Sequence, residues 1–64
     1  MVRINGEDLN ITGRTVAEFL TESGYDIRRV AVELNGDILP KVQYDSTVLQ
    51  DGDSVEIVSF VGGG

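Results

Sequence analysis

The 64-residue sequence contains no cysteine and no histidine, one proline and no tryptophan. Without cysteine the chain forms no disulfide and offers no thiolate ligand for zinc or an iron–sulfur cluster. Without histidine it lacks the commonest general base and the commonest metal ligand of proteins. These absences argue against an enzyme with its own catalytic side chains and against a metal site, and they fit a reducing compartment.

Positive charge is also scarce, since five basic residues stand against eleven acidic ones and the formal net charge is -6. A protein that binds a phosphate backbone needs the opposite balance, so no nucleic-acid partner is expected. No hydrophobic run approaches the length of a membrane span, and the first residues lack the apolar core of a signal peptide. We therefore expect a soluble, cytoplasmic protein of one small domain with no membrane partner.

The first half of the chain predicts a hairpin followed by a helix. Val2 and Ile4 alternate with polar residues, Asn5-Gly6 is a strong two-residue hairpin signal, and Leu9 and Ile11 continue as the returning strand. Residues 15–18, Thr-Val-Ala-Glu, have the form of a capping box, and an apolar helical face follows. With glycine at position 24 as a stop, the pattern predicts a helix over residues 15–24.

The second half predicts another hairpin and a last strand. Residues 30–34 alternate in polarity, Asn-Gly at 35–36 repeats the turn signal, and residues 37–39 return before the proline. Residues 41–49 are irregular, and we expect Tyr44, Val48 and Leu49 to enter the core. A turn at 51–53 precedes a strand over residues 55–61.

The resulting order, ββαββ, predicts an α+β protein with one helix on one face of a small mixed sheet. If the first and last strands are parallel neighbours at the centre, the arrangement is a β-grasp. We assign residues 1–61 to this domain and residues 62–64 to a flexible C-terminal glycine tail.

The last strand presents two different faces. Because a buried unpaired carboxylate is costly, the face with Glu56 is expected to point away from the helix. Val58 and Phe60 share that face and would form an exposed apolar docking surface for a partner. The alternative is that the loop over residues 41–49 folds across them.

The tail of Gly62, Gly63 and Gly64 offers a carboxylate on a thin lead with no side chains. A carboxylate is a poor acyl donor until it is adenylated by ATP, after which sulfur or nitrogen can take the acyl group. Glycine has no Cβ to obstruct a narrow channel and adopts backbone conformations closed to other residues. We therefore expect Gly62 and Gly63 to thread the tail into a partner's active site and Gly64 to carry the reacting group.

With these features the chain resembles the ThiS-type sulfur carrier proteins of thiamine biosynthesis along nearly its whole length. The matching motifs are Asn5-Gly6, residues 15–20 (TVAEFL), 30–36 (VAVELNG), 38–41 (ILPK) and 51–58 (DGDSVEIV), and Gly63-Gly64. Lys41 departs from the arginine more usual in the family, and Gly62 is a third glycine where two suffice.

The resemblance implies a ubiquitin-like β-grasp fold and activation by an E1-like adenylyltransferase, ThiF, which uses ATP and magnesium. The Gly64 carboxylate would become an acyl-adenylate and then a thiocarboxylate, with sulfur from a donor protein. It would deliver that sulfur to thiazole synthase, ThiG. The chain would then be a protein co-substrate and not an enzyme, with no cofactor of its own.

Three other functions use the same features. The chain could carry sulfur for molybdopterin, for cysteine or methionine synthesis, or for tRNA thiolation. It could be a ubiquitin-like modifier that joins its terminal glycine to a lysine, or a β-grasp interaction module with an inert tail.

Overall fold

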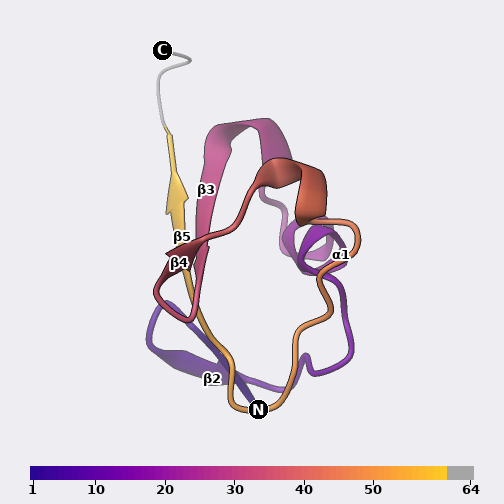
Figure 1. The fold of residues 1–64 in the computed structure, drawn as a ribbon, viewed down its shortest axis with the longest axis vertical. Coiled ribbons are helices and arrows are strands. Elements are labelled where there is room, and N and C mark those ends of the chain that lie inside the picture. The colour runs from indigo at the N-terminus through magenta and orange to yellow at the C-terminus, as the bar shows by residue number, and fades with distance from the viewer. Residues whose placement is uncertain (61–64) are drawn as a thin grey trace.

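The computed structural model describes residues 1–60, which form a five-stranded mixed sheet with one α-helix across it (Figure 1). The elements in chain order are β1 (Val2–Ile4), β2 (Glu7–Leu9), α1 (Val16–Glu22), the 3-10 helix η1 (Ile27–Arg29), β3 (Val30–Leu34), β4 (Asp37–Ile38), the 3-10 helix η2 (Lys41–Gln43) and β5 (Ser54–Ser59).

The strands lie in the order β2-β1-β5-β3-β4. β5 is central, parallel to β1 on one side and antiparallel to β3 on the other. Each outer strand is the hairpin partner of its neighbour, so β2 follows β1 and β4 follows β3. This is the β-grasp arrangement that the sequence predicts.

Both Asn-Gly hairpin turns are confirmed by their backbone angles. Asn5 and Gly6 have φ of 50° and 86°, and Asn35 and Gly36 have φ of 53° and 89°. The asparagine side chains add long-range bonds to β5 that the turn signal did not predict. Asn5 accepts a hydrogen bond from the Ile57 amide at 2.7 Å, and Asn35 accepts one from the Ser54 amide at 2.9 Å. Each hairpin is therefore joined to the central strand at its turn.

The helix is shorter than predicted, but both of its ends are as expected. The capping box is present, with the Thr15 hydroxyl accepting from the Glu18 amide at 3.1 Å and the Glu18 carboxylate accepting from the Thr15 amide at 2.8 Å. At the other end the amides of Gly24 and Tyr25 donate to the carbonyls of Thr21 and Leu20. This is a Schellman motif, and Gly24 supplies its left-handed residue with φ of 84°.

Replacement of Thr15 by alanine should destabilise the domain by about 0.5–2 kcal/mol, because the Glu18 amide loses its acceptor at the start of α1. In a domain of this size 1 kcal/mol corresponds to a fall in Tm of roughly 4–8 °C. Thermal unfolding followed by circular dichroism measures it. Thr15→Ser keeps the hydroxyl and is the control; an equal loss in both variants would show that the cap is not the cause.

One hydrophobic core lies between the sheet and α1. Its buried members are Val2, Ile4, Val16, Phe19, Leu20, Val30, Val32, Leu39, Tyr44, Leu49, Val55 and Ile57. Tyr44 and Leu49 enter it as predicted, whereas the prediction for Val48 is wrong, because that side chain is 47% exposed. Val48 pairs with Thr15 in an isolated bridge next to the buried Leu49, and its side chain is left outside.

The segment that follows β4 lies on the same side of the sheet as α1 (Figure 1). The amides of Val16 and Ala17 donate to the carbonyls of Thr47 and Tyr44, both at 2.9 Å. The first returning strand is also shorter than predicted. β2 ends at Leu9, and Ile11 instead begins a turn in which its carbonyl accepts from the Arg14 amide.

Candidate functional site

The candidate site is the C-terminal end of β5 together with the sheet face beside it. Gly62, Gly63 and Gly64, the predicted tail residues, lie outside the described residues, as does Val61. What the structure places is the strand that leads to them. β5 is bonded to a neighbour on both sides, and Phe60 continues the pairing through its amide, which donates to the Arg29 carbonyl at 2.7 Å.

The two faces of β5 are as predicted. Val55 and Ile57 are buried against the core, whereas Glu56, Val58 and Ser59 are exposed. The cross-strand register places Ala31 beside Val58 and Glu33 beside Glu56, so β3 presents the same alternation. We call the face that carries Ala31, Glu33, Ile38, Glu56, Val58 and Phe60 the open face of the sheet.

Large apolar side chains are exposed on the open face. The exposed fraction is 56% for Val58, 57% for Phe60 and 69% for Ile38. The alternative that the loop over residues 41–49 covers Val58 and Phe60 is wrong, because this loop is bonded to α1 on the opposite side. The physical reason is that Tyr44 and Leu49 complete the core, which fixes the path of the loop.

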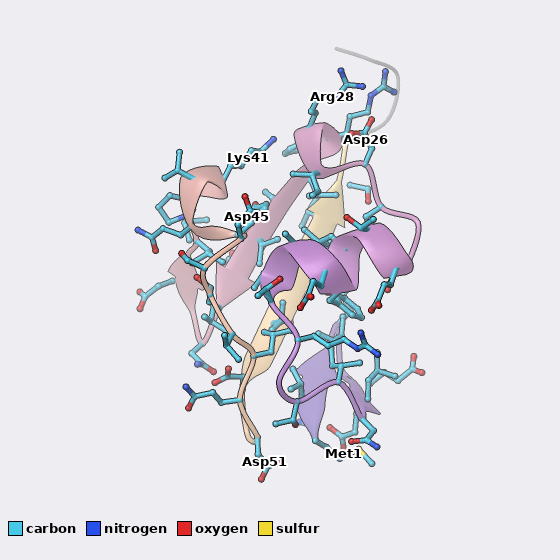
Figure 2. All side chains as sticks on the ribbon, turned by 90° about the vertical axis from the view of Figure 1, so that its right-hand side faces the viewer. Met1, Asp26, Arg28, Lys41, Asp45 and Asp51 are labelled. Carbon is cyan, nitrogen blue, oxygen red and sulfur yellow. The ribbon has the colours of Figure 1, made fainter. Side chains whose placement is uncertain are left out.

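Three basic residues lie in the two short helices near the end of β5. Arg28 and Arg29 lie in η1, and Lys41 begins η2 and donates from Nζ to the Arg28 carbonyl at 3.0 Å. Figure 2 shows Asp26, Arg28 and Lys41 toward one end of the molecule and Met1 and Asp51 at the other. Lys41, the departure from the family pattern, thus joins η2 to η1 beside the strand that leads to the tail.

Asp26 organises this end of the molecule. Its carboxylate accepts from the Arg28 amide at 3.0 Å and lies 3.5 Å from Arg28 Nε and 3.6 Å from Arg29 Nε. The hydrogen bond from the Arg28 amide, aided by the two guanidinium groups, lowers the pKa of Asp26 below its usual value. The carboxylate therefore stays ionised and caps the short helix before β3.

Phe60 also borders a shallow apolar depression at the edge of β3. Leu39, Pro40 and Tyr44 are among its other lining residues. Burial raises the pKa of the Tyr44 hydroxyl, against a smaller opposing effect of a hydrogen bond from the Val32 backbone. The hydroxyl therefore stays neutral at physiological pH, and Lys41 is the charged residue among those that line the depression.

The remaining polar clusters have structural partners. Asp53 accepts from the Asn35 side chain and the Gln50 amide, and Asp51 pairs with the N-terminal ammonium. Ser46 and Thr47 donate their hydroxyls to the Gln43 carbonyl. Within residues 1–60 no three potential metal-binding side chains gather, and no helix has the length and hydrophobicity to cross a membrane. The reacting group expected from the sequence is in the tail, which lies outside the described residues.

Comparison with known proteins extends these observations beyond residue 60. The sequence model of the ThiS family matches residues 2–64. The sulfur carrier protein ThiS of Thermus thermophilus is 39% identical over 64 residues, and the match covers 100% of both chains. The crystal structure of a thiamine biosynthesis protein (ThiS) from Geobacter metallireducens superposes with a TM-score of 0.78 at 36% identity and covers 98% of this chain and 97% of that one.

A second type of relative is longer. A thiazole synthase of Paramagnetospirillum magneticum is 50% identical over 62 residues, which is 95% of this chain but 19% of that protein. The chain thus spans about a fifth of the length of the thiazole synthases that it matches. A segment similar to nearly all of this chain occurs within those larger proteins.

Proposed function

Because this chain belongs to the ThiS family, we propose that it is a sulfur carrier of thiamine biosynthesis whose Gly64 carboxylate is adenylated and then converted to a thiocarboxylate. The observation that carries the proposal is the correspondence with named sulfur carriers over their whole length, including the glycines that follow β5. The relatives with that name are carrier proteins, so the chain acts as a co-substrate.

The order of bonds follows from the chemistry of a carboxylate. An oxygen of Gly64 attacks the α-phosphate of ATP, the bond to pyrophosphate breaks, and an acyl-adenylate forms. A persulfide on a donor protein then attacks the acyl carbon and AMP leaves, which gives an acyl disulfide between carrier and donor. A thiol attacks the donor's sulfur in that disulfide, so a new disulfide forms on the donor and the thiocarboxylate is released on the carrier. ATP and magnesium are bound by the E1-like activating enzyme, so this chain needs no cofactor site.

The fold separates the part of the chain that docks on the activating enzyme from the part that reacts. β5 pairs with β3 as far as Ser59, and Phe60 bonds to Arg29, so the strand that leads to the tail is fixed relative to the open face. An extended chain spans only about 3.3–3.6 Å per residue, so the end of a short tail stays close to the folded domain. The activating enzyme must therefore contact the body near Phe60, and Gly62 and Gly63 cross the narrow part of its active site.

A thiazole synthase is the proposed acceptor of the sulfur. In the Paramagnetospirillum and Magnetococcus relatives with that name, the matching segment is part of the same protein. Covalent linkage raises the effective concentration of one partner at the other, so it is useful where the two act together. In this proposal the present chain would deliver its sulfur to a thiazole synthase.

The proposal is tested by incubating the chain with a cognate E1-like adenylyltransferase, ATP and a sulfur donor, followed by intact mass spectrometry. The expected product has one oxygen replaced by sulfur at Gly64. A ladder of larger conjugates would instead indicate a modifier. If the mass of the chain does not change with any cognate activating enzyme, the proposal is contradicted, and the chain is better described as an interaction module with an inert tail.

Replacement of Phe60 by alanine should weaken docking to the activating enzyme far more than folding. A phenylalanine side chain buried on association contributes about 1.5–3 kcal/mol, so KM for the carrier should rise roughly 10- to 100-fold at unchanged Tm. Steady-state adenylation and thermal unfolding measure the two effects. Val42→Ala is the control, because Val42 is 89% exposed on η2 and away from the open face; a large fall in Tm for Phe60→Ala would assign that residue to the fold.

A further inference from the structure

Two glutamates occupy directly opposed positions at the centre of the sheet. The register of β3 and β5 places Glu33 directly opposite Glu56, and both side chains are exposed. Directly opposed residues of an antiparallel pair have Cβ atoms about 4.5–5.5 Å apart, and like charges in that position destabilise the sheet. Folding alone therefore does not account for this pair.

No basic side chain of the chain relieves the repulsion. Among residues 1–60, Arg3 pairs with Asp8, Arg14 with Glu22, and Arg28 and Arg29 with Asp26, while Lys41 binds a backbone carbonyl. Residues 61–64 contain no lysine or arginine. On the β1 side, the Asn5 side chain bonds to the Ile57 backbone through both its oxygen and its nitrogen.

The surroundings of the pair are apolar toward Val58 and polar in the other direction, where Asn35 bonds to Ser54. Ile38 lies beside Glu33 on β4, and the next cross-strand pair on the same face is Ala31 with Val58. A partner that covers this apolar surface also covers the two carboxylates. Burial of a charge without a counter-charge is costly, so a neutral or acidic partner surface would be rejected.

We propose that the open face docks on a surface of the activating enzyme that inserts an arginine guanidinium between Glu33 and Glu56 and packs apolar side chains against Ile38 and Val58. A guanidinium suits this position because its planar fork of donors can bond two carboxylates at once. The inference rests on the proposed function, since that function supplies the partner. In this proposal the carboxylate pair determines which partner binds. The chain keeps the pair although the repulsion between the two groups lowers its stability.

The test compares two doubly substituted carriers that lose the same charge. Glu33→Gln with Glu56→Gln should raise KM for the carrier in adenylation at least about 10-fold with kcat retained, and should flatten its dependence on salt. Its Tm should rise by a few degrees as the repulsion is removed. The control, Glu7→Gln with Asp45→Asn, changes exposed carboxylates off the open face and should alter KM less than about 2-fold.

A single charge reversal separates docking from stability more sharply. Glu33→Lys places an ammonium opposite Glu56 and creates a favourable cross-strand pair within the chain. We expect a higher Tm than that of the natural chain, together with a larger rise in KM than in the double glutamine variant.

The proposal is overturned if the natural chain is adenylated normally and both open-face variants keep its KM, or if the control variant loses as much as they do. In either case the proposed sulfur-carrier function stands. If no cognate activating enzyme adenylates the natural chain, the proposed function fails first and this inference fails with it.

Discussion

Deletion of Gly64 is expected to abolish thiocarboxylate formation while it leaves the domain folded. The new carboxylate would end one residue, or about 3.3–3.6 Å, short of the position at which the activating enzyme holds the α-phosphate of ATP. Bond formation needs the reacting atoms about 3–3.5 Å apart, so a displacement of this size removes the reaction. Intact mass spectrometry after incubation with the activating enzyme, ATP and a sulfur donor measures the product.

The thermal stability of the same variant serves as the control. Because the core and the pairing of β5 lie within residues 1–60, Tm should stay within about 2 °C of the natural value, well inside the 4–8 °C expected for a loss of 1 kcal/mol. The open face is also unchanged, so the shortened chain should inhibit adenylation of the natural chain competitively. A shortened chain that is thiocarboxylated at the normal rate would show that the reacting group is elsewhere.

Replacement of Leu20 by alanine should have the largest effect on stability. Leu20 has no exposed surface and lies in α1 against the sheet, in the middle of the single core. Truncation of a buried leucine costs about 2–5 kcal/mol through lost burial and the cavity that remains. A core of this size supplies only about 3–5 kcal/mol in total, so the variant should be largely unfolded at 37 °C.

Urea denaturation followed by circular dichroism measures this change as a shift of the transition midpoint. Val42→Ala is again the matched control, because it shortens an exposed side chain and should change stability by less than about 0.5 kcal/mol. A transition for Leu20→Ala as stable as that of the control would mean that α1 contributes little to the core.

The sequence predicted elements whose signals are local. The Asn-Gly turns need positive φ at both positions, and the structure has them at residues 5–6 and 35–36. The capping box and Gly24 define both ends of α1, because each acts within a few residues. The element order then left few ways to cover the apolar faces, and the β-grasp topology followed from it.

Other features of the site depended on contacts between distant residues. The exposure of Val58 and Phe60 could be decided only from the path of the loop over residues 41–49. That path is set by Tyr44 and Leu49, which enter the core under α1. The position of Val48 was mispredicted for the same reason, since hydrophobicity alone does not say which of two adjacent residues faces inward.

The sequence by itself determined the local turns, the helix and its caps and the resemblance to sulfur carriers, and it is the basis for proposing the terminal glycines as the reacting end. Only the tertiary structure decided that Glu33 stands opposite Glu56 and that Asn5 and Asn35 bind the central strand. The physical reason is how far apart in the sequence the interacting residues lie. Turns and caps are set by bonds between residues close in the chain, whereas strand register is set by packing of the whole core, and a shift of one residue would turn every side chain of β5 to the other face.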